Sequence, residues 1–176
     1  MPAPDNSGLS RAAHEFASED YSWTARVRWI ADPQASAGTT TAGKATAYTR
    51  NHAFSIGQPA SFKESDEHPS AVEYLLGALG GDLLSGFHTL AARHGVPIDG
   101  MEVSLSGRLN NPLVFLGVIG EAGHPGFEEI TGTLYVSTDA DEPTLQKIWQ
   151  MTLARSPLVN TLNRCLTLSL NLKVVG

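Results

Sequence analysis

The most unusual candidate for chemistry is Asp82, an acidic residue inside a long apolar stretch of the 176-residue chain. Leu75 and Leu79 precede it at helical spacing and share its side of the expected helix, so the carboxylate faces apolar neighbours. A carboxylate in such surroundings needs a cation or hydrogen-bond donors, or it stays protonated. We expect Arg50 or Arg155 to pair with it, because a guanidinium satisfies several carboxylate bonds at once. Asp82 is then either a ligand-facing acid or one half of a structural salt bridge.

The remaining nucleophiles and possible metal ligands are few and scattered. Cys165 is the only cysteine, which excludes a disulfide framework within the chain and a zinc site built from cysteines. Ser85 and His88 lie three residues apart on the same expected helix, but no acid at helical spacing orients the histidine for nucleophilic catalysis. His88, His94 and His124 lack the spacing of metal ligands. The sequence therefore predicts neither a metal site nor a bound cofactor.

The charge balance limits the partners of the chain. With 12 Lys+Arg against 18 Asp+Glu the formal net charge is −6, and no basic stripe is present, so nucleic acid is not expected as a partner. Only 17% of the residues are charged, against roughly 25% in an average chain, which predicts that a second copy covers part of the surface. The stretch 74–92 has membrane length, but Asp82 within it argues against a membrane span. Because the N-terminus has no apolar leader core, the expected location is cytoplasmic.

Hydrophobic periodicity places these residues on an α+β framework. Residues 1–17 are expected to form a flexible tail and residues 18–176 a single domain. Trp23, Trp29 and Trp149 lie on alternating or helical apolar faces, which places them in the core. Alternating residues predict strands, and apolar residues at helical spacing predict helices. The predicted strands are 19–30, 44–56 (two strands broken near Arg50–Asn51), 101–109, 114–119, 129–137 and 165–175, and the predicted helices are 70–93, 142–155 and a short one from Ser156–Pro157.

The long helix is expected to be buried on two sides. One face carries leucines and Phe87, and the opposite face carries small residues, namely Gly77, Gly80, Gly81 and Ser85. Each interior glycine costs roughly 1 kcal/mol relative to alanine. A second backbone that packs closely against this face would offset that cost.

Four short motifs resemble those of one known family. They are Arg50-Asn51-His52, the run EYLLGALGG at 73–81, ARHGVPI at 92–98 and SPLV at 156–159. Their order and spacing resemble the OsmC/Ohr superfamily, named after osmotically inducible protein C and organic hydroperoxide resistance protein. The resemblance implies an α+β fold and an intertwined homodimer, in which antiparallel sheets wrap around two central helices. It also implies the family's usual chemistry, the reduction of organic hydroperoxides in the oxidative stress response.

The resemblance also assigns site residues, and the chain departs from the family at both thiols. The family's peroxidatic cysteine follows the ALGG run, where this chain has Asp82, and its second cysteine precedes the proline, where this chain has Ser156. Arg50 and Glu73 stand where the family has an arginine and a glutamate that tune the first thiol. From the residues alone, Glu73 is also explained as a first-turn acid of the helix, and Ser156 as an N-cap.

The loss of both thiols argues against the family's peroxidase activity. Peroxide reduction needs a thiolate that becomes a sulfenic acid and a second thiol that resolves it, and neither Asp82 nor Ser156 has this chemistry. We therefore expect a non-peroxidase, regulatory or binding homodimer that takes a small, mostly apolar ligand at Arg50, Glu73, Asp82 and Ser156. The alternatives are organic hydroperoxide detoxification through a non-standard residue such as Cys165, acid–base catalysis by Asp82, or a purely structural role.

Overall fold

The computed structural model describes residues 23–31, 43–57, 68–164, 168 and 170–173. The chain divides into two compact units, residues 1–56 and residues 57–176. The tail expected over residues 1–17 lies outside the described residues, and the single domain expected over residues 18–176 stays a prediction.

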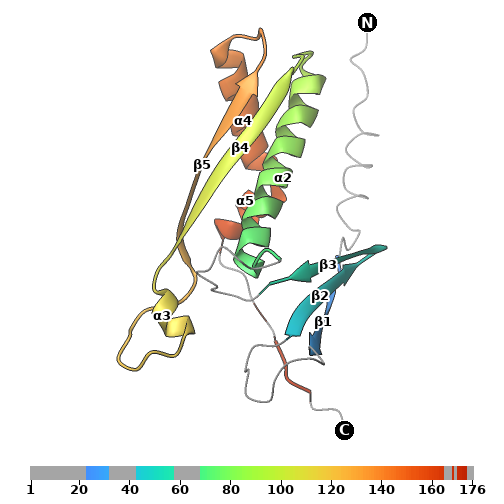
Figure 1. The fold of residues 1–176 in the computed structure, drawn as a ribbon. Helices are drawn as coiled ribbons and strands as arrows, with labels where there is room; N and C mark the ends of the chain where they lie inside the picture. Colours follow the sequence, from blue (N-terminus) through green and yellow to red (C-terminus); the bar gives the residue numbers. More distant parts are fainter. Residues whose placement is uncertain (1–22, 32–42, 58–67, 165–167, 169, 174–176) are drawn as a thin grey trace, which may run out of the picture. The chain divides into compact units, whose positions relative to one another are not determined.

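The first unit is a small antiparallel sheet with the strand order β1-β2-β3 (Figure 1). Strands β2 and β3 form a hairpin in which Thr49 pairs with His52, so Arg50 and Asn51 make the turn, as predicted. Arg50 has a φ of 50°, and no other non-glycine residue in the described part of the chain has a positive φ. The strands are β1 (Arg26–Ala31), β2 (Gly43–Thr49) and β3 (His52–Ile56).

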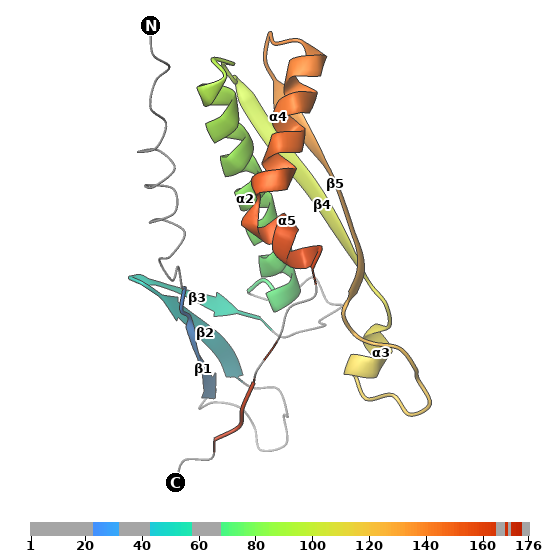
Figure 2. The same cartoon turned by 180° about the vertical axis from the view of Figure 1, so that it is seen from behind.

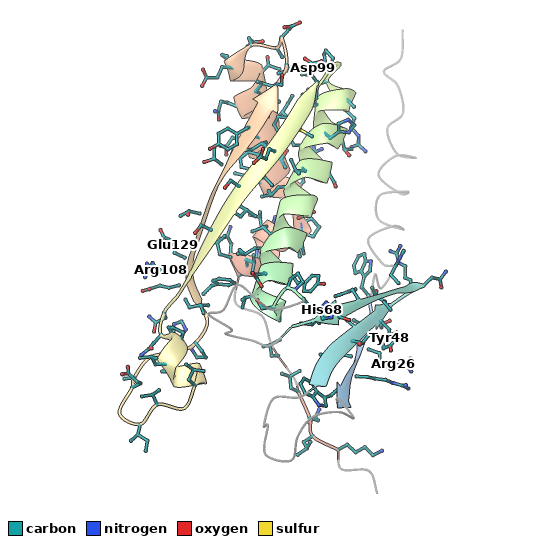
Figure 3. The ribbon with its side chains drawn as sticks, in the orientation of Figure 1. Arg26, Tyr48, His68, Asp99, Arg108 and Glu129 are labelled. Atoms are coloured by element: carbon teal, nitrogen blue, oxygen red, sulfur yellow. The ribbon has the colours of Figure 1, made fainter. Side chains whose placement is uncertain are left out.

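Large aromatic side chains of this unit are exposed in the single chain. Trp23 is 78% exposed and Trp29 is 59% exposed, so the prediction that both belong to the core is wrong for the chain by itself. Arg26 and Tyr48 pair across β1 and β2, and the guanidinium carbon lies 5.4 Å from the centre of the tyrosine ring (Figure 3). This cation–π contact supports the pairing of the two strands.

The second unit places two helices on one face of a two-stranded ribbon. Strands β4 and β5 pair antiparallel, from Gly100 opposite Ser137 to Leu109 opposite Phe127. Helices α2 and α4 lie side by side over this ribbon, and α5 follows the end of α4 (Figures 1 and 2). The elements are α2 (Ala71–Arg93), β4 (Gly100–Leu109), α3 (Pro112–Phe115), β5 (Phe127–Ser137), α4 (Glu142–Arg155) and α5 (Pro157–Leu162).

The local sequence explains where α2 begins and ends. Ser70 is the N-cap, and its hydroxyl accepts a hydrogen bond from the backbone N–H of Glu73. The Glu73 carboxylate in turn accepts from the N–H and the hydroxyl of Ser70, at 2.7 Å each, which completes a capping box. The helix ends at Arg93, two residues before Gly95, whose φ is +70°. The helix predicted over residues 70–93 is therefore confirmed.

The core of this unit lies between α2, α4 and the ribbon. Phe87, Leu90, Ala91 and Ile148 are each at most 5% exposed and form one apolar cluster. Trp149 packs against this cluster, with 6.5 Å between the ring centres of Trp149 and Phe87. Complete burial of a side chain such as Phe87 or Ile148 contributes about 2–3 kcal/mol to stability.

The glycines of α2 have two different surroundings. Gly80 lets the helix approach β4, because a Cβ atom built there would lie 3.2 Å from Cγ1 of Val103. Apart from the neighbouring residues and backbone of α2 itself, no described atom lies within 4 Å of a Cβ atom built at Gly77 or Gly81. The described part of this chain therefore leaves the Gly77 and Gly81 side of α2 without the close neighbour expected from the sequence.

One of the predicted strands is contradicted by the structure, and another is described only in part. The strand predicted over residues 114–119 is wrong, because Pro112 starts the short helix α3 and the side chain of Asn111 caps it by accepting from the N–H of Leu113. Cys165 and five other residues of the strand predicted over residues 165–175 lie outside the described residues. The described remainder has no strand pairing, and its three leucines are 75–93% exposed; they are Leu168, Leu170 and Leu172.

Among the described helices, none combines the length and the apolar character that a membrane span requires.

Candidate functional site

The two positions at which the chain departs from the family's cysteines are in direct contact. Asp82 lies in the middle of α2, and Ser156 lies between α4 and α5. The hydroxyl of Ser156 donates a hydrogen bond to Oδ2 of Asp82 at 2.5 Å. Ser156 is 4% exposed, so water competes little for this bond. The structure therefore brings together two of the four residues expected at the site.

The same contact fixes the start of α5. The backbone N–H of Leu158 donates to Oδ2 of Asp82 at 3.2 Å, and the N–H of Val159 donates to the hydroxyl oxygen of Ser156 at 2.9 Å. Ser156 is thus the N-cap of α5, as the sequence also predicted, with Pro157 in the first turn. The Asp82 carboxylate acts as a second cap, because it accepts from a free N–H of the first helical turn and carries the negative charge that a helix N-terminus favours.

Among the described residues of the second unit, no cation forms an ion pair with Asp82. Arg155 lines the same cavity as Asp82, but the two form no ion pair within 4.0 Å in the described part of the chain. Hydrogen-bond donors from Ser156 and Leu158 contact Oδ2 of the carboxylate in its place. Arg50 belongs to the first unit, and its pairing with Asp82 stays a prediction.

A cavity of about 280 Å³ that is open to solvent on one side lies beside the Asp82–Ser156 contact, between α2 and the junction of α4 and α5. Several of the polar groups that line it are already hydrogen-bonded. The hydroxyl of Thr152 donates to the carbonyl of Ile148 at 2.9 Å, and the hydroxyl of Thr89 donates to the carbonyl of Ser85 at 2.8 Å. The cavity is lined by Asp82, Ser85, Gly86, Thr89, Leu90, Arg93, Thr152, Arg155, Ser156 and Pro157.

This bonding pattern leaves the cavity mainly apolar. A threonine hydroxyl that donates to its own helix backbone has used its only donor, so it can only accept from a ligand, and the rest of the side chain offers a methyl group. The methyl carbon of Thr152 lies 3.3 Å from the place of a Cβ atom at Gly86, so the glycine provides room next to it. The cavity can therefore hold an apolar group, with charged side chains at Asp82, Arg93 and Arg155.

The structure gives Glu73 a local partner. Its carboxylate forms the capping box with Ser70, nine residues and thus about 14 Å of helix rise before Asp82. The side-chain and backbone hydrogen bonds from Ser70 lower the pKa of Glu73, because they favour the charged carboxylate. These bonds are those of a helix cap, and the role of Glu73 at the ligand site stays a prediction.

Arg50 is held in an unusual backbone conformation. Its φ of 50° lies in the region that glycine and asparagine adopt most easily, yet the hairpin turn has an arginine there. A long side chain at such a position costs stability that a glycine would not. The structure shows the strain at this position, and the role of the guanidinium at the ligand site stays a prediction.

The histidines considered as metal ligands do not come together. In the described part of the chain, no group of three or more His, Cys, Asp or Glu side chains is placed to hold a metal ion. Nδ1 of His94 lies 2.8 Å from the carbonyl oxygen of Leu90, and Nδ1 of His124 accepts from the N–H of Gly126 at 3.2 Å. Cys165 lies outside the described residues, so its distance from the site is not defined.

Sequence reasoning missed the residues that continue the site along α2. Ser85, Thr89 and Arg93 line the cavity together with Asp82. Their positions follow Asp82 at intervals of three, seven and eleven residues, which is the spacing of one helix face. The spacing shows in the sequence that these residues share a helix face with Asp82. Whether that face borders a cavity depends on where α4 packs.

The fold and site define a protein class. Antiparallel strands, a long central helix that carries the Asp82 position, and a short helix after a Ser-Pro step form an α+β protein of OsmC-like architecture. The family model described as OsmC-like protein matches residues 64–171, more than half of the chain. The chain therefore belongs to the OsmC-like protein family. No curated protein matches it.

Solved structures support the same fold. An OsmC-like protein from Mycoplasma pneumoniae has a TM-score of 0.63 at 16% identity, and the match covers 82% of this chain and 89% of that one. An OsmC-like protein of unknown function from Vibrio cholerae has a TM-score of 0.60 at 12% identity, with 81% and 94% covered. An organic hydroperoxide resistance protein from Legionella pneumophila has a TM-score of 0.56 at 8% identity, with 81% and 91% covered. The predicted α+β, OsmC-like fold is thus confirmed.

Proposed function

We propose that this chain is a cytoplasmic homodimer that binds a small, mostly apolar molecule in the cavity beside Asp82, and that it is not a thiol peroxidase. The observation that carries the proposal is the hydrogen bond between Asp82 and Ser156, at the two positions where the family resemblance places cysteines. Neither a carboxylate nor a hydroxyl is oxidised by a peroxide to the sulfenic acid on which the family's reaction depends.

The cavity supports binding as the retained function. Its volume of about 280 Å³ is close to the lower end of typical ligand pockets, and it has apolar walls next to a few charged groups. The remaining candidate residues, Arg50 and Glu73, belong to the proposal as expectations from the sequence. In a dimer, a second copy would cover the exposed Gly77 and Gly81 side of α2 and the exposed leucines near the C-terminus.

Ligand binding and peroxide consumption test the two parts of this proposal separately. The purified protein should be screened by thermal unfolding against a panel of neutral and charged eight-carbon compounds, and at least one should raise the unfolding temperature. Thr89→Phe, which fills the cavity, should abolish that increase. Gln150→Phe, a change at an exposed position of α4 outside the cavity, should preserve it.

The peroxidase alternative is tested with cumene hydroperoxide and a dithiol reductant. We expect no consumption above the rate of buffer with reductant. Turnover that persists in a Cys165→Ser variant but is lost in Asp82→Asn would replace the binding proposal with catalysis at Asp82. Turnover lost only in Cys165→Ser would instead support the alternative of hydroperoxide detoxification.

A further inference from the structure

Two arginines line the cavity, and neither forms an ion pair with an acid in the part of the chain that the structure describes. Arg93 lies in the last turn of α2, and Arg155 lies in the last turn of α4. The ion pairs found among the described residues all belong to Arg108, which bonds to Glu128 and Glu129 on the ribbon (Figure 3 labels Arg108 and Glu129). Both guanidinium groups therefore border the cavity without an ion-pair partner among the described residues.

The nearby acid does not neutralise these two charges. Both bonds to the Asp82 carboxylate come from Ser156 and Leu158, and neither arginine donates to it within the described part of the chain. With two arginines and one aspartate, the formal charge of the lining is 2 − 1 = +1. A ligand with one negative charge would balance it, whereas a neutral ligand would leave it unbalanced and a cation would increase it.

The two arginines occupy different parts of the cavity wall. Arg93 follows Asp82 by eleven residues on α2, which corresponds to about 16 Å of helix rise. Arg155 directly precedes Ser156, whose hydroxyl contacts Asp82. Between them the wall is formed by small and apolar groups, including Gly86, Leu90 and the methyl group of Thr152.

We infer that this cavity binds an organic monoanion, an apolar group that carries one carboxylate, with Arg93 and Arg155 supplying the charge that selects it. The inference rests on the proposed function and adds the chemical class of the ligand. Guanidinium groups are the side chains best suited to a carboxylate, since they donate two parallel hydrogen bonds to it. The apolar wall between them accommodates the rest of the molecule.

Three probes of equal chain length separate the contribution of the ligand's charge to binding from the contribution of its apolar chain. Octanoate, 1-octanol and octylamine should each be titrated into the full-length protein by calorimetry. Octanoate should bind most tightly and octylamine least tightly. Raising the salt concentration should weaken the binding of octanoate more than that of octanol, because these arginines are exposed and salt screens exposed charges.

Arginine variants test the assignment of the residues. Arg93→Gln and Arg155→Gln combined in one variant should weaken octanoate binding about tenfold and should change octanol binding less than about twofold, and the single variant with the larger effect identifies the arginine that contacts the carboxylate. Arg164→Gln, at an exposed position outside the cavity, is the matched control and should bind octanoate like the wild type. The molecular mass in solution and the urea midpoint of each variant should match those of the wild type.

Different experimental results would contradict this inference and the proposed function. If octanol binds as tightly as octanoate and the arginine variants change neither, the cavity binds apolar ligands and the anion inference is wrong. If none of the three probes binds, the proposed function fails together with it. If Arg155→Gln or Arg93→Gln changes the mass of the assembly in solution and leaves octanoate binding intact, that arginine belongs to a subunit interface and its assignment to the ligand site is wrong.

Discussion

The hydroxyl of Ser156 and Oδ2 of Asp82 lie 2.5 Å apart although 74 residues separate them in the sequence. This contact joins the middle of α2 to the first turn of α5, and the carboxylate also accepts from the N–H of Leu158. The acid and the hydroxyl therefore form a hydrogen-bonded pair at the two positions to which the family resemblance assigns thiols. Stability, ligand binding and redox behaviour at this pair can be measured independently.

The first prediction concerns the coupling of Asp82 and Ser156. Ser156→Ala removes the bond to Asp82 and the cap of α5, and should lower the free energy of unfolding by about 1–3 kcal/mol. Asp82→Ala should be destabilising as well. In the double variant the two losses of stability should not add. The double-mutant cycle should give an interaction energy of about 1 kcal/mol or more between the two side chains. Ser106→Ala, at an exposed position of β4, should change stability by less than about 0.5 kcal/mol. Strictly additive losses would show that the two side chains are not coupled.

The second prediction concerns a double variant with cysteine at positions 82 and 156. The sulfur of Asp82→Cys takes the place of the carboxylate carbon, so a shift of about 1 Å brings it to bonding distance of the sulfur of Ser156→Cys. In a Cys165→Ser background, oxidation of this double variant should consume both free thiols and raise stability by up to about 4 kcal/mol. Each single variant should keep its one thiol. Two free thiols after oxidation would contradict the geometry of the pair.

The third prediction is a pH dependence at the start of α2. Bonds from Ser70 lower the pKa of Glu73 from its ordinary value of 4.5. A carboxylate with a depressed folded pKa stabilises the fold above its unfolded pKa, and this contribution is lost as the pH falls through the folded pKa. The urea midpoint should therefore decrease from about pH 5 to about pH 3, and less steeply in Glu73→Gln. Bonds from Thr144 lower the pKa of Asp141 as well, so part of the decrease should remain.

The matched control for this titration is Glu102→Gln, at an exposed position of β4 with no hydrogen bond to a described side chain. It should keep the pH dependence of the wild type. An identical dependence in Glu73→Gln would show that the capping box contributes nothing to acid sensitivity.

The fourth prediction uses the strain at Arg50. Arg50→Gly should stabilise the protein by about 1 kcal/mol, because glycine adopts a φ of 50° without the steric penalty of a side chain. Asn51→Gly, at the neighbouring turn position where φ is not positive, should give no such gain. If Arg50 serves the ligand site, Arg50→Gly should also reduce octanoate binding, so stability and binding would change in opposite directions. A loss of stability would show that the arginine side chain contributes more than the strain costs.

The fifth prediction tests the exposed face of α2. If a second copy packs there, Gly81→Leu should disrupt the dimer, and sedimentation should show a mass near the 18.7 kDa of one chain. Gln150→Leu adds the same side chain at an exposed position of α4 and should leave the mass of the dimer unchanged. If the face is open to solvent instead, Gly81→Ala should simply stabilise the helix by about 1 kcal/mol.

The sequence by itself determined the elements that depend on neighbours along the chain. The capping box of Ser70 and Glu73 and the Ser-Pro start of α5 are local signals, and both predicted helices over residues 70–93 and 142–155 are found. The family was also readable, because the order and spacing of its short motifs can be followed along the chain, and the family model matches residues 64–171. The strand expected over residues 114–119 failed because Asn111 and Pro112 favour a short helix more strongly than the apolar pattern favours a strand.

Only the tertiary structure decided the partners of the site residues. The sequence offered Arg50 or Arg155 to Asp82, whereas the packing of α2 beside α4 presents a serine hydroxyl and a backbone N–H. The same packing turns one face of α2 into the wall of a cavity and brings Arg93 to it. Periodicity shows which residues share a helix face, but the contacts between residues far apart in the chain are set by how whole helices fit together.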